Sequence, residues 1–184
     1  EFTKCIIASA GSYTCNMNKL KQYIIKGIIF VSITGTASHF VYEWSGNNSL
    51  LGLIFPINES VWEHMKLGFF PMLLYSFYMN RRLKSDYPCV TSALLFGVLL
   101  NTYLIPVLFY TYSGILGYNT SVLDISTFFV SVILSFLAVY KLTLSCRLTA
   151  YTPLFSLLIL LTAISFLLFT YHPLNIGIFD VPAK

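Results

Sequence analysis

Charged residues are scarce in this 184-residue chain. Asp, Glu, Lys and Arg make up 10% of the sequence, against about a quarter in a typical soluble domain. Hydrophobic residues make up 57%. A chain with so little charge cannot cover a globule with polar side chains, which excludes an ordinary soluble domain and indicates lipid as the solvent. The length allows one domain only.

Several functional motifs are also missing. The sequence contains no glycine-rich phosphate-binding loop, no basic patch of the kind that binds nucleic acid and no His-Glu-x-x-His zinc motif. These absences exclude the simplest nucleotide-binding and nucleic-acid-binding functions, and any metal site must be assembled from separate segments.

Long apolar runs occur about five times along the chain. Each has roughly the 20 residues that a helix needs to cross a bilayer, and backbone groups in hydrocarbon must be paired within the helix. We therefore predict an all-α integral membrane bundle of about five transmembrane helices, forming a single domain over residues 17–184. The predicted spans are Ile24–Tyr42, Val61–Met79, Cys89–Thr111, Val122–Tyr140 and Ala150–Tyr171.

Residues 1–16 are polar and small, and Met17 is followed by a sequence typical of a natural start. We expect these 16 residues to be vector-derived or an upstream extension, and we leave them out of the fold prediction.

The basic residues predict the orientation. Lys and Arg gather in cytoplasmic loops, and five crossings place nine of the eleven on one side. The opposite loops, 43–60 and 112–121, contain neither residue type. This predicts an N-terminus inside and a C-terminus outside, in a cell membrane. Cys89 and Cys146 then fall on the inner side, where disulfides rarely persist.

The same topology brings most ionisable groups to the outer face. All three histidines and five of the seven acidic residues fall there. Ionisable groups at the mouth of a membrane helix are costly and often functional. Imidazole and carboxylate together suit zinc or another divalent first-row metal. The predicted metal ligands are His39, His64, His172 and Asp124.

The stretch from Asn58 to Lys66 is the densest polar segment, and it runs directly into the second span. A metal site here could activate water for hydrolysis. We predict Glu63 or Glu59 as the general base, with Ser60 as a further catalytic candidate. Candidate substrate contacts, for a lipid or a small molecule, are Glu43, Asn58, Trp62, Lys66 and Asn101.

Each of these residues also has a structural interpretation. Ser60 and Glu63 match a capping box, a common helix start, and Lys66 could pair with Glu63. Trp62 fits an interfacial aromatic belt. Asn101, near the middle of the third span, is expected to form an interhelical hydrogen bond.

Three functions therefore stay open from the residues alone. The first is a metal-binding protein that hydrolyses a lipid-phase or extracytoplasmic substrate. The second is a small transporter or proton-coupled carrier, because protonatable groups at a helix mouth could carry a proton. The third is a non-catalytic structural or assembly protein whose polar cluster locks helices together. The sequence gives no oligomeric state.

Four segments carry a resemblance to a known family: His39–Asn48, Pro56–Lys66, Phe70–Tyr75 and Ile105–Gly117. Together, and with an Asn-Glu-Ser-x-Trp-Glu-His-x-Lys signature, they resemble an uncharacterised family of small prokaryotic multi-pass membrane proteins. The resemblance covers most of the chain after Met17. It implies a prokaryotic integral membrane protein and no particular activity.

Overall fold

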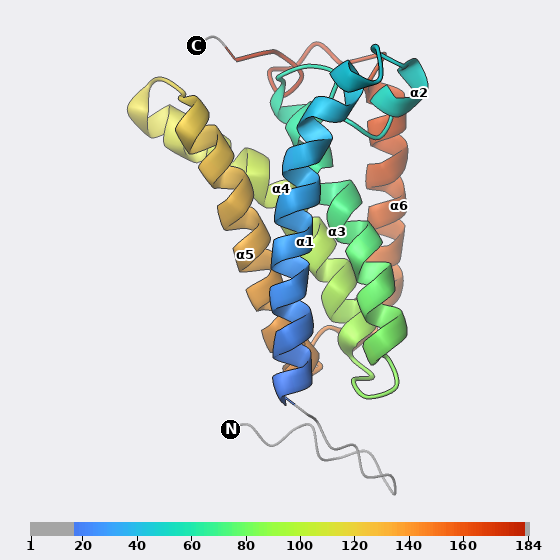
Figure 1. The fold of residues 1–184 in the computed structure, drawn as a ribbon. Coiled ribbons are helices and arrows are strands. Elements are labelled where there is room, and N and C mark those ends of the chain that lie inside the picture. The colour runs from blue at the N-terminus through green and yellow to red at the C-terminus, as the bar shows by residue number, and fades with distance from the viewer. Residues whose placement is uncertain (1–16, 183–184) are drawn as a thin grey trace, which may run out of the picture.

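The computed structural model describes residues 17–182, in which all regular structure is helical. The predicted all-α class is confirmed at this level, and each predicted span coincides largely with one long helix (Figure 1). The helices are α1 (Met17–Trp44), α2 (Ser49–Gly52), α3 (Val61–Leu83), α4 (Val90–Leu116), α5 (Ser121–Ser145), the 3-10 turn η2 (Thr149–Tyr151) and α6 (Thr152–Phe169). The prediction for residues 1–16 lies outside the described residues.

Helix α4 lies at the centre of the arrangement. It packs against α3, α5 and α6, and α1 packs against α3 and α5. The described chain begins at one end of the bundle and finishes at the other, where α2 and the C-terminal segment also lie (Figure 1). Opposite ends for the two termini fit an odd number of passes through the bundle.

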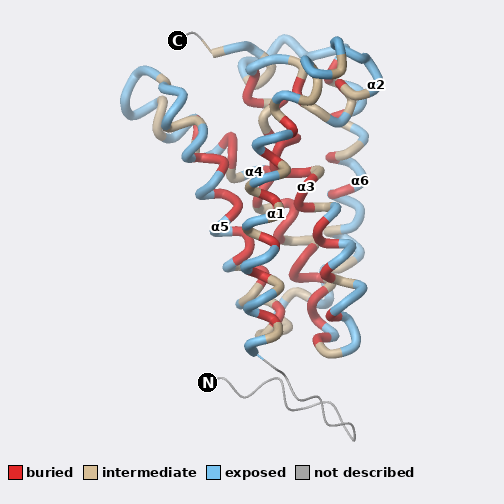
Figure 2. Tube along the Cα trace, viewed as in Figure 1, coloured by how far each residue is buried: buried red, intermediate tan, exposed pale blue. Residues whose placement is uncertain are grey.

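Within residues 17–182, four segments are long and apolar enough to cross a membrane: Met17–Trp44, Val90–Leu116, Ser121–Ser145 and Thr149–Phe169. Helix α3 does not belong to this set. It has 23 residues but carries Glu63, Lys66, Arg81 and Arg82. Glu63 and Lys66 are among the many residues that α3 buries inside the bundle, whereas Arg81 and Arg82 are exposed in its last turn (Figure 2).

Helix α6 shows the opposite pattern. It contains no charged residue, yet only Ile159, Thr162 and Phe166 are buried. Its exposed large apolar side chains are Leu154, Leu157, Leu158, Leu160, Leu161, Ile164, Leu167 and Leu168. Contact between these side chains and water would be unfavourable, whereas contact with lipid is not. The uncharged helix α6 is thus largely exposed, whereas α3 buries Glu63 and Lys66, as expected when lipid is the solvent.

The expected interhelical hydrogen bond of Asn101 is present. Its Nδ2 donates to the carbonyl of Gly68 on α3 at 3.0 Å, and its Oδ1 accepts from the Ser131 hydroxyl on α5 at 2.9 Å. The side chain is completely buried. A Cβ at Gly68 would lie 2.7 Å from Asn101 Nδ2, so the glycine is what allows this approach. Asn101 therefore joins three helices at the middle of the bundle.

We expect Asn101→Ala to lower the free energy of unfolding by about 1–3 kcal/mol, because two buried hydrogen bonds are lost, one to the Gly68 carbonyl and one from the Ser131 hydroxyl. Denaturant unfolding in detergent micelles measures this. Asn18→Ala, at an exposed position at the start of α1, is the matched control. Equal stability of the two variants would contradict a structural role for Asn101.

One expectation about the cysteines is wrong. Cys89 and Cys146, predicted to remain thiols, are joined by a disulfide with their Cα atoms 5.2 Å apart. Cys89 caps the start of α4 and Cys146 the end of α5. The antiparallel packing of these helices brings together two residues 57 positions apart, a proximity that sequence spacing cannot reveal.

Candidate metal site

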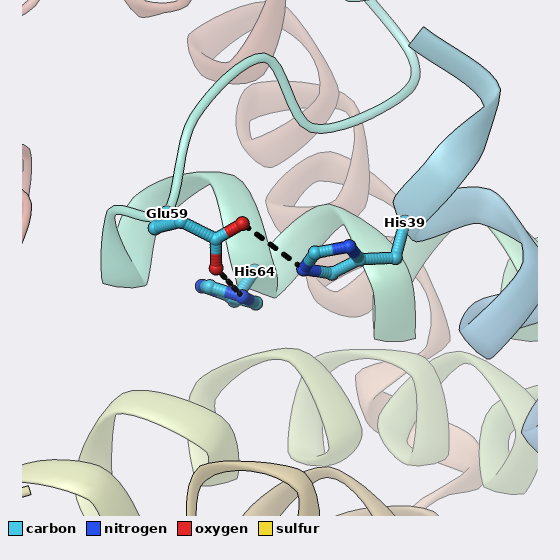
Figure 3. A group of neighbouring side chains, drawn as sticks. All are labelled: His39, Glu59 and His64. Atoms are coloured by element: carbon cyan, nitrogen blue, oxygen red, sulfur yellow. Dashed lines mark ion pairs between the residues drawn. The ribbon is translucent and has the colours of Figure 1, made fainter. Parts of the chain in front are cut away.

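Three side chains from three segments converge at the end of the bundle where α2 lies: His39, Glu59 and His64 (Figure 3). The Nε2 atom of His39 lies 3.4 Å from Glu59 Oε1, and Nε2 of His64 lies 3.3 Å from Glu59 Oε2. One potential ligand atom from each residue falls within 4.8 Å of the others. These three residues form the candidate metal site.

Close packing of α1 on α3 brings the two histidines together. A Cβ at Gly35 would lie 2.8 Å from the Leu67 carbonyl oxygen. Pro71 has no N–H with which to bond that carbonyl four residues before it. His39 lies one turn beyond Gly35 on α1, and His64 lies one turn before Leu67 on α3. The two imidazole centroids are consequently 5.4 Å apart.

Glu59 lies in the turn before α3 and not on the helix. Asn58 Oδ1 accepts from the Ser60 amide at 2.9 Å, and the Ser60 hydroxyl accepts from the Glu63 amide as the N-cap. Residues four positions apart share one face of a helix, but the cap at Ser60 places Glu59 outside α3. The carboxylates of Glu59 and Glu63 therefore contact different partners.

His64 is held in one orientation by its own helix. Its Nδ1 lies 2.9 Å from the Ser60 carbonyl oxygen. A carbonyl only accepts, so Nδ1 carries a proton and Nε2 is the atom left to face Glu59. A backbone bond to the second ring nitrogen is the usual way in which a metal-binding histidine is oriented.

The charge state of Glu59 is set by the histidines. The hydrogen bond from His64, aided by the charge of His39, lowers the pKa of Glu59 to about 2, although burial opposes the shift. The carboxylate is therefore ionised at neutral pH. A neutral His64 would direct a lone pair at this anion, so the geometry is favourable only when a proton or a metal cation lies between them.

Glu63, the other predicted base, is committed to an ion pair. Its Oε2 accepts from Lys66 Nζ at 2.7 Å and from the Ile57 amide at 3.0 Å. Lys66 also donates to the Gly52 carbonyl at 3.0 Å and to Thr170 Oγ1 at 2.6 Å. The ammonium's three donors are all used, and its side chain is completely buried. These contacts support the structural interpretation, in which Lys66 pairs with Glu63.

Two predicted metal ligands do not join the cluster. Asp124 accepts a hydrogen bond from the Tyr112 hydroxyl, and His172 is exposed in the C-terminal segment. Neither belongs to the group of close ligand atoms found among residues 17–182.

Three further predicted site residues, Glu43, Trp62 and Asn101, do not belong to the cluster. Glu43 is exposed near the end of α1. Trp62 packs its ring against Phe166, Phe169 and Phe179. Asn101 lies in the bundle interior and bonds α3 and α5, as described above.

Sequence reasoning missed three partners of the Glu63–Lys66 pair: the Gly52 carbonyl, the Ile57 amide and Thr170. Two are backbone groups, which carry no side-chain signal. Thr170 lies 104 residues from Lys66, at the end of an apolar run, so no sequence pattern links the two residues.

In the part of the chain that the structure describes, the fold is all-helical, four helices are suited to crossing a membrane and a His/Glu group could hold a metal. The chain belongs to the family of unknown function DUF6512, whose model matches residues 13–183. No curated protein and no solved structure matches it.

Proposed function

We propose that this protein is a multi-pass membrane protein that binds Zn²⁺ or another divalent first-row metal ion at His39, Glu59 and His64, and that the site hydrolyses a substrate from the lipid phase or from outside the cell. The observation that carries the proposal is the convergence of two imidazole nitrogens on one ionised carboxylate. Two histidines and one carboxylate form a donor set used by catalytic zinc sites.

Three protein ligands leave a position open on a tetrahedral metal. When bound, the ion would supply a Lewis acid and a water of lowered pKa at that position. Glu59 itself serves as a ligand, and Glu63 is occupied by Lys66. Asp124 and His172 remain candidates for further ligands or for proton transfer if their segments approach the cluster.

The direct test is metal analysis of the purified protein. We expect about one equivalent of metal per chain after dialysis against Zn²⁺, and a rise in thermal stability with added Zn²⁺. A ligand that binds only the folded state, at a free concentration of 100 times its Kd, raises the free energy of unfolding by about 2.7 kcal/mol. No bound metal and no stabilisation would rule the proposal out. A structural or transport role would then be favoured, the latter by pH-dependent uptake in liposomes.

We further propose that the chain crosses a prokaryotic plasma membrane five times, with α3 crossing in addition to the four apolar segments, the N-terminus inside and the metal site outside. The distribution of Lys and Arg supports this orientation. The buried ion pair of Lys66 and Glu63 supports a transmembrane α3, because each charge is paired with the other and does not have to be solvated by water.

The cysteine pair provides a test of orientation. The pair is joined by a disulfide in the structure, and in the proposed orientation it lies at the cytoplasmic end of the bundle. After reduction in intact cells, we expect both thiols to react with a membrane-permeant maleimide and to be protected from an impermeant one. Gel shifts measure this, with a variant that lacks Cys89 and Cys146 as the control. Labelling of the two thiols by the impermeant reagent would indicate the reverse orientation.

A further inference from the structure

The segment from Gly52 to Ser60, which carries Glu59, is fastened at two points by one ion pair. Lys66 holds the Gly52 carbonyl at 3.0 Å, and Glu63 holds the Ile57 amide at 3.0 Å. Ile57 lies two residues before Glu59. The cap at Ser60 fixes the other side of Glu59. The backbone on both sides of Glu59 is therefore tied to α3.

The same ammonium also reaches α6. Lys66 Nζ donates to Thr170 Oγ1 at 2.6 Å, and the Thr170 hydroxyl donates a hydrogen bond to the Phe166 carbonyl at 2.6 Å. Thr170 is 5% exposed. A buried ammonium that loses one of its three acceptors must either move or leave one N–H donor without a partner. A change at Thr170 is thus transmitted to Gly52 and Glu63, and through Ile57 to Glu59.

We propose that Glu63, Lys66 and Thr170 are positioning residues for Glu59, so that the metal affinity of the site depends on the end of α6. This rests on the proposed function, because it assigns a supporting shell to the same site. Partners outside the coordination shell usually change metal affinity about 10–100-fold when they are removed.

Thr170→Val tests the proposal, since valine keeps the shape of threonine and removes only the hydroxyl. The matched control is Thr162→Val, at a position on α6 that is 4% exposed and bonds Tyr103 instead of Lys66. Zn²⁺ affinity is measured by competition with a chromophoric chelator. We expect about a 10-fold loss for Thr170→Val and less than a twofold change for Thr162→Val. Equal affinities for the two variants would overturn the proposal.

A double-mutant cycle with Glu59→Gln separates positioning from general destabilisation. If Thr170 acts through Glu59, Thr170→Val has no further effect on Zn²⁺ affinity once Glu59 is replaced. If the two losses add, Thr170 does not act through Glu59 and the inference is wrong. A wild-type protein that binds no Zn²⁺ would defeat the proposed function itself, whereas unchanged binding in Thr170→Val defeats only the positioning role.

Discussion

Replacing Lys66 by methionine is expected to lower the free energy of unfolding by about 3–5 kcal/mol, the cost of removing one partner from a buried ion pair. The substitution leaves Glu63 buried, at 2% exposure, with its main cationic partner gone. It also leaves the Gly52 carbonyl and Thr170 without their donor. The loop before α3 and the end of α6 would both loosen as a result.

Denaturant unfolding in detergent micelles checks this expectation. Lys21→Met, at an exposed position of α1, is the control and should change stability by less than about 0.5 kcal/mol. A double variant, Glu63→Gln with Lys66→Met, should recover part of the loss because no uncompensated charge remains. If Lys66→Met is as stable as Lys21→Met, the ammonium does not hold these segments together.

His64→Ala is expected to weaken Zn²⁺ binding by more than 100-fold. A direct ligand should matter more than the outer partners, whose removal usually costs about 10–100-fold. The variant removes the Nε2 atom facing Glu59 and leaves two ligand groups, His39 and Glu59. Isothermal titration with Zn²⁺ and metal content after dialysis both report the loss.

Two further alanine variants locate the coordination shell. His39→Ala should weaken binding as strongly as His64→Ala. His172→Ala makes the same chemical change at an exposed histidine outside the cluster. A comparable loss in His172→Ala would add the C-terminal segment to the shell. Unchanged binding in both His39→Ala and His64→Ala would show that the cluster is not a metal site.

Part of the candidate site could be predicted from the sequence. The spans and their order predict that His39 ends one helix and His64 begins the next at the same face, and the two imidazoles do lie together. The choice between Glu59 and Glu63 could not be predicted. It depends on where α3 begins, and the cap at Ser60 places Glu59 outside the helix.

The sequence by itself determined the helical class, the approximate positions of the long helices and the polar character of one end of the bundle. These follow from local requirements: a backbone in hydrocarbon must pair its own polar groups, and charged side chains must avoid lipid. Only the tertiary structure decided which carboxylate faces the histidines, which groups hold Lys66 and which cysteines meet. Those pairings join residues as far as 104 positions apart, and they depend on how helices pack, a property that no local pattern encodes.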